Sequence, residues 1–388
     1  MHKDENFLLM IRRVGGIYIH IPFCRQACRY CDFYFIVSSQ YQDQFTEMLL
    51  KEIESGATEQ VGKRMQTLYL GGGTPSLLSA ENLQKIVQGI RSGYAFSEDA
   101  EMTIECNPDD LDDSKLEKLR ELGFKRISIG IQSFQEEDLT LMRRSHSASQ
   151  AAISVQKAVS AGFSNITIDL IYGIPGQTSE HWRDNILRAL DLPVNHISAY
   201  HLTFESGTVF DHWRKKGRIA PVGEDESVKM YRLLRKELSG AGFEHYEISS
   251  FAKEGFRSRH NQIYWSGEAY LGFGPSAHSF NGSSRYWNVG SLKKYMKALA
   301  AGEAISEMED LSAREQYHDY LITSLRTREG ADPGIIGSRF GKEVQDHFQL
   351  RTDKFLKEGL MIDLGERRAI DPDGWLLADH IMRELFLG

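Results

Sequence analysis

Apolar and polar residues in the first two-thirds of the chain follow two alternating patterns. Short runs are almost continuously apolar and rich in β-branched residues, which predicts parallel strands covered on both faces. Longer segments carry apolar residues at i, i+3 and i+4 spacing, which predicts helices that pack one face on a sheet. Six strands are predicted, beginning at Gly16, Gln66, Glu101, Arg126, Asn165 and His196. Five helices are predicted between them, within residues 44–55, 80–90, 115–123, 151–162 and 182–192.

Repeated strand–helix units of this kind wind into an α/β fold with right-handed crossovers. The six units are fewer than those that close a complete barrel, so we expect a partial (βα)6 barrel. A flat, doubly wound sheet is the alternative, and a count of strands does not distinguish the two.

The rest of the chain predicts smaller, different units. A helix within residues 227–242 and a strand within 245–251 precede a segment rich in glycine and aromatic residues. From about residue 302 the pattern is helical, and its order of helix, helix and short hairpin resembles a small winged-helix domain. The predicted parts are a core at 9–243, an aromatic segment at 244–300 and a helical C-terminal domain at 301–388.

Composition and charge narrow the class of protein. Hydrophobic residues make up 41% and charged residues 26%, as in soluble globular proteins. The net charge of −8 argues against a nucleic-acid partner, which usually meets a basic face. No apolar run reaches the roughly 18 residues of a membrane span, and the N-terminus is a poor signal peptide. We therefore expect a cytoplasmic protein, in which thiols stay reduced.

Three of the four cysteines, Cys24, Cys28 and Cys31, form a C-x3-C-x2-C pattern directly after the first predicted strand. Three thiolates from one loop suit a metal ion or an iron–sulfur cluster. A zinc site would need a fourth ligand, for which His20 has unusual spacing and Cys106 lies far along the chain. A [4Fe–4S] cluster on three thiolates would leave one iron open for a substrate or cofactor.

Polar residues end several of the predicted strands. Glu105, Gln132 and Asp169 lie in the third, fourth and fifth strands, whose carboxyl ends would share one mouth of a barrel. Each alone is more often a helix cap or a surface residue, but several at one mouth together favour a site. The triple glycine at 71–73 ends the second strand, where it lets the backbone approach a ligand or forms a tight turn.

The cysteine pattern, its place after the first strand and the predicted partial barrel together resemble the radical S-adenosylmethionine (SAM) superfamily. The resemblance implies a [4Fe–4S] cluster whose open iron binds SAM, and an electron donor that reduces the cluster. In that superfamily the reduced cluster cleaves SAM to methionine and a 5′-deoxyadenosyl radical. The triple glycine then corresponds to the GGGTP element, which contacts the aminoacid end of SAM.

Motifs along nearly the whole chain are similar to those of the oxygen-independent coproporphyrinogen III oxidase group, among them YIHIPFCRQACRYCDF, YLGGGTPSLL, DLIYGIPGQT and YLGFGPSAHSF. The helical C-terminal region resembles the smaller domain of that group. In MRRSH, relatives commonly have a glycine before the arginine, so the choice of Arg144 over Arg143 rests on alignment. The resemblance implies SAM contacts at Tyr18, Gly72, Thr74, Glu105, Gln132, Arg144 and Asp169.

Two departures indicate one branch of this group. True oxidases carry a further cysteine two residues after the triad, where this chain has Phe33, and a longer N-terminal arm. Both departures favour the haem chaperones of the HemW type. HNQIYW fits the haem-binding motif H-N-x-x-Y-W of that branch, which implies His260 as iron ligand or attachment point and Tyr264 and Trp265 as an aromatic face.

Other residues near this motif are weaker candidates. A histidine beside aromatic residues is in general more often structural than a ligand. His278, in GPSAHSF, is a second candidate for the haem ligand without support from a motif. Arg257 and Arg259 are candidates to pair with haem propionates, because guanidinium groups suit carboxylates.

The sequence therefore predicts a haem chaperone with a radical SAM core, which binds a [4Fe–4S] cluster, SAM and haem and passes haem to acceptor proteins such as membrane-associated respiratory enzymes. No catalytic residue is assigned, and the prediction leaves open whether SAM is cleaved. The alternative is an oxygen-independent coproporphyrinogen III oxidase, which decarboxylates propionates in porphyrin biosynthesis. A third alternative is a βα scaffold that binds zinc through the cysteine triad.

Overall fold

The computed structural model of the protein describes residues 14–57 and 64–388. The predicted start of the core at residue 9 lies outside the described residues. Nearly all of the segment before the first predicted strand also lies outside them.

Six parallel strands form the centre of one large sheet, and their spatial order follows their order in the chain. A doubly wound sheet would reverse direction at an internal strand, so this order excludes that alternative. The predicted run of six βα units is confirmed. The strands are β1 (Val14–Ile21), β2 (Arg64–Gly72), β3 (Ala95–Cys106), β4 (Arg126–Gln132), β5 (Asn165–Tyr172) and β6 (His196–His201).

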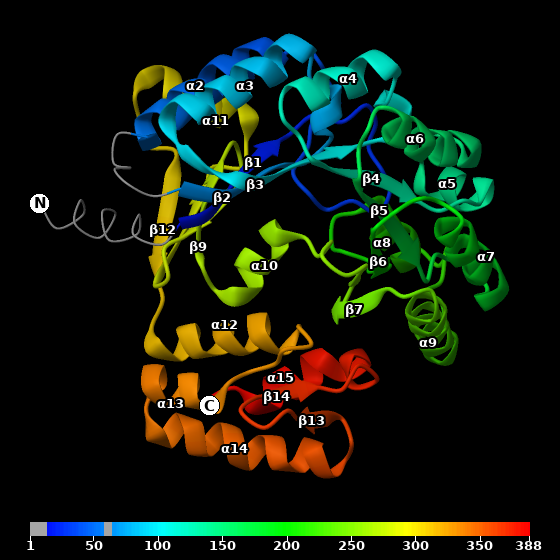
Figure 1. Ribbon diagram of the computed structural model, residues 1–388, viewed down its shortest axis with the longest axis vertical. Coiled ribbons are helices and arrows are strands. Elements are labelled where there is room, and N and C mark those ends of the chain that lie inside the picture. Colours follow the sequence, from blue (N-terminus) through cyan, green and yellow to red (C-terminus); the bar gives the residue numbers. More distant parts are fainter. Residues whose placement is uncertain (1–13, 58–63) are drawn as a thin grey trace, which may run out of the picture.

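Helices cover the outer face of these strands, as Figure 1 shows. Their apolar faces and the apolar strand residues form a continuous core, in which Ile19, Leu70 and Ile168 are fully buried. The predicted helices are present, together with the short α5, which the periodicity did not indicate. The covering helices are α2 (Gln42–Ala57), α3 (Ala80–Gly93), α4 (Asp113–Glu121), α5 (Glu136–Met142), α6 (Ala148–Ser160) and α7 (Ser179–Leu190), with single turns η2 (Pro75–Leu77) and η3 (Pro108–Asp110).

The chain extends this sheet at both edges. After α8 (Val209–Lys215) and α9 (Glu224–Gly240), the single strand predicted at 245–251 is a hairpin of β7 (Glu244–Glu247) and β8 (Ser250–Ala252) beside β6. The prediction of one strand was wrong because residues 247–250, where the chain reverses, contain no glycine or proline that would mark a turn.

The aromatic segment builds the other edge. After α10 (Arg259–Ser266), strand β9 (Ala269–Phe273) pairs in parallel with β1, and β10 (His278–Phe280), β11 (Ser284–Asn288) and β12 (Ser306–Asp310) follow antiparallel. Helix α11 (Leu292–Ala301) connects the last two strands. Residues 306–310 were predicted as part of a helical region; every residue of β12 is exposed, so no apolar periodicity marks it. The sheet runs β12-β11-β10-β9-β1-β2-β3-β4-β5-β6-β8-β7 and is therefore not closed into a barrel.

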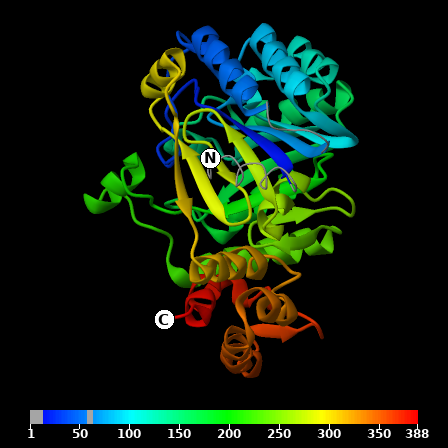
Figure 2. The same cartoon turned by 90° about the vertical axis from the view of Figure 1, so that its left-hand side faces the viewer.

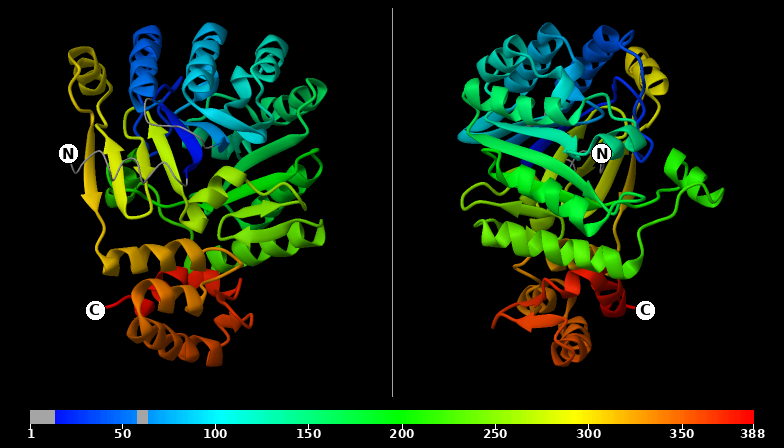
Figure 3. Two further views of the ribbon diagram at one scale, coloured as in Figure 1. Left: turned by 60° about the vertical axis from the view of Figure 1, so that its left-hand side comes forward. Right: turned by 90° about the vertical axis from the view of Figure 1, so that its right-hand side faces the viewer.

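The C-terminal region is mainly helical, as predicted. Figures 2 and 3 show it below the sheet, and α12 contacts α10 there. Three helices precede a short antiparallel hairpin, which gives the predicted order of helices and hairpin. The elements are α12 (Ala313–Leu325), α13 (Pro333–Phe340), α14 (Lys342–Lys357), β13 (Met361–Asp363), β14 (Arg368–Ile370), η4 (Gly374–Leu377) and α15 (Ala378–Leu385).

A buried carboxylate joins the added edge of the sheet to the first helix. Glu52 of α2 accepts hydrogen bonds from the Gly274 amide at 2.8 Å, from Asn288 Nδ2 at 2.6 Å and from the Tyr295 hydroxyl. These partners lie after β9, at the end of β11 and in α11. Burial outweighs the three hydrogen bonds and raises the pKa of Glu52 to about 7.

This pKa predicts a pH-dependent contribution to stability. Between about pH 4.5 and 7 the folded chain keeps a proton on Glu52 that the unfolded chain has released. The contribution of Glu52 to the free energy of unfolding therefore falls as pH rises through this window, by on the order of 3 kcal/mol. In Glu52→Gln this loss is absent, so the variant gains relative to wild type between pH 4.5 and 7. Urea unfolding across this range measures the difference, and a pH-independent difference would contradict the assignment.

Helix α5 ends on a residue with an unfavourable backbone conformation. Arg143, its C-cap, has φ 59° and ψ 53°, in the left-handed region that glycine favours. We expect Arg143→Gly to raise the free energy of unfolding by about 0.5–1 kcal/mol, because the cost of a left-handed side-chain residue exceeds the added freedom of the unfolded glycine. Arg143→Ala keeps a Cβ and serves as the control in urea unfolding. An equal gain in both variants would exclude the backbone as the cause.

Candidate functional site

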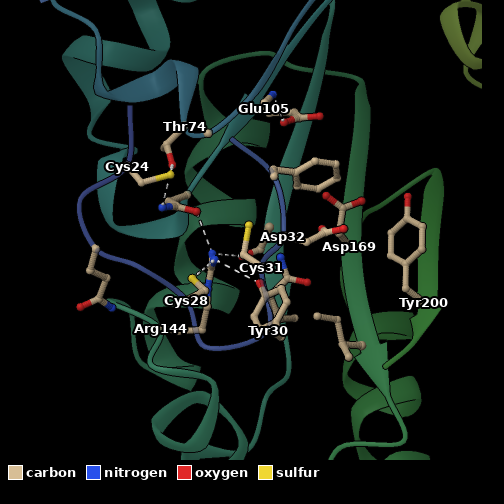
Figure 4. A pocket seen from close by; sticks show the side chains of 18 of the residues that line it. Cys24, Cys28, Tyr30, Cys31, Asp32, Thr74, Glu105, Arg144, Asp169 and Tyr200 are labelled. Atoms are coloured by element: carbon tan, nitrogen blue, oxygen red, sulfur yellow. Dashed lines mark hydrogen bonds between the residues drawn. The ribbon is translucent and has the colours of Figure 1, made fainter. Parts of the chain in front are cut away.

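The main pocket lies at the carboxyl edge of the parallel strands and has a volume of about 390 Å³. The cysteine loop after β1 forms one wall, and the ends of β2 to β6 form the other. This is the edge at which βα folds place their ligands, since the connecting loops gather there. Figure 4 shows side chains from both walls directed into the pocket.

The cysteine loop is held closed at its base and supported at its tip. The Cys24 amide donates to the Ile36 carbonyl at 3.0 Å, and the Ile36 amide donates to the Pro22 carbonyl at 2.7 Å. At the tip, the Arg29 amide bonds the Met142 carbonyl at 3.1 Å, and the Arg29 carbonyl accepts from the Phe210 amide at 3.0 Å. The backbone thus fixes the loop between the sheet, α5 and α8.

All three thiols of the loop line the pocket, each partly buried. Cys24 Sγ lies 3.7 Å from the Thr74 hydroxyl, and Cys28 Sγ lies 3.4 Å from Arg144 Nη1. Burial raises the pKa of Cys24 to about 11 and that of Cys31 to about 12, so without a metal both are neutral at pH 7. Binding a metal would therefore release protons from these thiols.

These residues fit an iron–sulfur cluster. The fourth cysteine, Cys106, borders the pocket but is 3% exposed, and its thiol faces the Ile104 carbonyl and Ser76. Among the described residues, no three histidine, cysteine or acidic side chains surround the position of a single ion. Three thiolates match the soft donors that Fe–S clusters require, and each would hold a different iron.

The triple glycine is required by close packing behind the loop. A Cβ on Gly73 would lie 2.6 Å from the Phe23 carbonyl oxygen, and Gly72 has φ +107°. The Gly72 amide donates to Glu105 Oε2 at 3.1 Å. The resemblance implied that this glycine contacts SAM. Its amide instead positions the Glu105 carboxylate, which itself faces the pocket.

Two partly buried carboxylates make the wall on β3 and β5 acidic. Glu105 accepts from the Tyr69 hydroxyl at 2.7 Å, and Asp169 accepts from the Ser128 hydroxyl at 3.2 Å. Burial raises the pKa of Glu105 to about 7 and that of Asp169 to about 6. Both groups would be stabilised by a positively charged ligand.

A guanidinium group provides the opposite charge. Arg144 Nη2 donates to Asn107 Oδ1 and to the Gly130 carbonyl, both at 2.7 Å, and Nη1 lies 3.5 Å from the Tyr30 hydroxyl. None of these partners is a carboxylate. Arg143 is exposed and is not among the residues that line the pocket, whereas Arg144 is.

Of the other predicted SAM contacts, Gln132 lines the pocket and Tyr18 does not. Gln132 lines the pocket with φ 69°, a left-handed conformation at the irregular end of β4. Tyr18 is not among the lining residues; its hydroxyl bonds His20 Nδ1 at 3.1 Å, behind the wall. Tyr30, Asn107 and Tyr200 line the pocket without having been predicted, because a sequence does not show which loops converge on a strand end.

The motif histidine of α10 is buried in the interior. His260 is 1% exposed; its Nδ1 lies 2.7 Å from Thr67 Oγ1 and its Nε2 lies 2.8 Å from the Tyr264 hydroxyl oxygen. Its ring stacks on Tyr69 at 5.0 Å, and burial lowers its pKa to about 3. Helix α10 can approach so closely because Gly16 of β1 lacks a Cβ. Both ring nitrogens of His260 are thus engaged, unlike those of the free iron ligand expected from the motif.

The two arginines proposed for haem propionates have other partners. Arg257 pairs with Glu244 and Glu329, each at 2.7 Å, and Arg259 pairs with Asp99 at 3.0 Å. These ion pairs satisfy both guanidinium groups, so the structure does not support that prediction. The sequence does not reveal these carboxylates because they lie far away along the chain.

Tyr264 and Trp265 line a second pocket of about 380 Å³, between the outer strands and the C-terminal helices. His278 lies in the same pocket. The two pockets are joined by a chain of contacts, in which Tyr69 bonds Glu105 and stacks on His260, and His260 bonds Tyr264.

No helix within residues 14–57 and 64–388 combines the length and the apolar character of a membrane span.

Comparisons with known proteins agree with this architecture. Residues 18–189 match the radical SAM superfamily. The chain is 35% identical to the heme chaperone HemW of Bacillus subtilis (strain 168), over 96% of this chain and 98% of that protein. It is 33% identical to the heme chaperone HemW of Lactococcus lactis subsp. lactis (strain IL1403), over 97% and 99% of the two chains.

Among solved structures, coproporphyrinogen III oxidase (HemN) from Escherichia coli, a radical SAM enzyme, superimposes with a TM-score of 0.84. The two chains are 25% identical, and the match covers 98% of this chain and 92% of the oxidase. The fold is therefore shared with the oxidase, whereas the higher full-length sequence identity is to the HemW proteins. The chain belongs to the radical SAM superfamily and, within it, to the family of the HemW proteins.

Proposed function

We propose that this protein is a haem chaperone with a radical SAM core, which binds a [4Fe–4S] cluster, SAM and haem and transfers haem to acceptor proteins. The observation that carries the proposal is the similarity to HemW proteins over nearly the full length of both chains. The pocket supports it because three thiols, an acidic wall and a guanidinium group line one space.

Cys24, Cys28 and Cys31 would hold the cluster, and SAM on its open iron supplies radical chemistry when both are bound. The chain's own residues orient the ligand by charge. The methionine end of SAM carries an ammonium and a carboxylate group, which match Glu105 and Arg144 respectively. Asp169 provides a second carboxylate near the ends of the strands. Gly72, Thr74 and Gln132 complete the wall.

The partners of the protein follow from this role. We infer a cytoplasmic location, where the three thiols stay reduced until the cluster forms. An electron donor is needed if the cluster is reduced during the cycle. The haem acceptors include, in this proposal, membrane-associated respiratory enzymes.

The oxidase is the alternative, and one residue in the pocket argues against it. Phe33 lines the pocket and is 66% exposed. It occupies the position at which the resemblance implies a further cysteine in a true oxidase. A phenyl ring supplies neither a thiolate nor a proton to a substrate.

The experiment that decides between these functions offers coproporphyrinogen III and haem separately to the reconstituted protein under anaerobic conditions, with SAM and a reductant. We expect stoichiometric haem binding, transfer of haem to an apo-acceptor and no decarboxylation. Conversion of coproporphyrinogen III at enzymatic rates, or absence of haem binding, would overturn the proposal.

We predict that Cys28→Ser abolishes the cluster and leaves the fold intact, because Cys28 lies partly exposed in a loop outside the core. Reconstituted wild type should contain about four irons per chain with matching sulfide, and the variant almost none. Cys106→Ala is the control and should keep the iron. One zinc per chain without sulfide would favour the zinc scaffold instead.

We also predict that Glu105→Gln weakens SAM binding by about tenfold or more, because it removes the negative charge that faces the ligand's ammonium group. Equilibrium dialysis of the reconstituted variant measures the affinity, and its iron content should not change. Glu98→Gln, at the exposed start of the same strand, is the matched control. Equal affinities in wild type and Glu105→Gln would remove Glu105 from the SAM site.

A further inference from the structure

The second pocket has the size and walls of a site for a flat aromatic ligand. Its volume of about 380 Å³ lies in the range of about 300–1,000 Å³ found for small-molecule sites. Tyr264 of α10, Tyr270 of β9, Phe280 of β10 and Tyr320 of α12 contribute rings to its lining. Aromatic rings of this kind stack well on a planar macrocycle.

His278 is the histidine of this pocket whose nitrogens are free. Because residues i and i+2 of a strand share a face, His278 and Phe280 of β10 point to the same side, and both line the pocket. The side chain is exposed, and within the described residues its ring contacts Trp287 at 6.3 Å without a hydrogen bond to either nitrogen. A neutral imidazole is a common ligand to metal ions.

Polar groups for carboxylates are also present. Arg339 of α13 lines the pocket, and its guanidinium group lies over the rings of Tyr320 and Phe340. It forms no ion pair with a carboxylate of the described residues. The indole Nε1 of Trp265 is buried without a hydrogen-bond partner. Arg285, in contrast, is neutralised by its ion pair with Asp319. Among the described residues, Arg339 therefore lines the aromatic pocket without an ion pair.

We propose that haem binds in this second pocket, with His278 as the protein ligand to its iron and Arg339 beside a propionate. The inference rests on the proposed function as a haem-binding protein and specifies its site. His260 and Tyr264 then act as positioning residues, since their mutual hydrogen bond orients the tyrosine wall. The site is separate from the pocket of the cysteines, and the contact chain through His260 joins the two.

The test compares ferric haem with iron-free protoporphyrin IX in titrations of the full chain. His278→Ala should weaken haem binding by about tenfold or more and change the ligand signature in the optical and electron paramagnetic resonance spectra. Binding of protoporphyrin IX should not change, because it forms no bond to an imidazole. His212→Ala, which removes an exposed histidine of α8, is the control. Arg339→Gln should weaken both ligands but not haem dimethyl ester, which lacks the propionate charges.

The outcomes separate this inference from the proposed function. If wild type binds haem and His278→Ala keeps its affinity and spectrum, the inference is overturned and the proposed function stands. The same holds if His260→Gln, folded by circular dichroism, loses the iron signature while His278→Ala keeps it. If wild type binds neither haem nor protoporphyrin IX, the proposed function itself fails.

Discussion

The parallel pairing of β9 with β1 is the interaction on which the rest of the structure depends. It returns the second half of the chain to the first strand, so that β1 has a neighbour on both sides and its carboxyl end leads into the cysteine loop. The pairing brings α10 over β1 and β2, where Gly16 leaves room for His260. The Glu52 hydrogen bonds hold the same junction from the outside. This strand pair therefore fixes the position of the cysteine loop relative to the second pocket.

Burial determines the electrostatics of both pockets. In the first, it raises the pKa of Glu105 and Asp169, and Arg144 has no carboxylate partner among the described residues. A ligand with an ammonium and a carboxylate group would therefore favour the ionised carboxylates and pair with the guanidinium group. In the second, ion pairs neutralise most charged groups, and free donors remain at His278 and Arg339. The Tyr69–His260–Tyr264 contacts lie between the two.

The parts of the fold that depend on local periodicity were predictable. The six βα units and the helical C-terminal region follow from apolar spacing. The C-x3-C-x2-C loop and the GGGTP element lie at the ends of the first and second strands, as predicted. The β7–β8 hairpin and the exposed strand β12 were missed, because the hairpin has no glycine or proline at its turn and β12 has no apolar face. Arg143 has a left-handed conformation that glycine favours, and apolar spacing does not predict it.

The sequence by itself determined which residue types are present at which strand ends, and therefore the cysteine triad and the acidic residues of the main pocket. Tertiary structure decided which of these groups are free. Arg257 and Arg259 form ion pairs with carboxylates from elsewhere in the chain. Both ring nitrogens of His260 have hydrogen-bond partners, whereas those of His278 have none among the described residues. The physical reason is that a side chain's availability depends on hydrogen-bond and ion-pair partners from elsewhere in the chain, and local spacing carries no information about them.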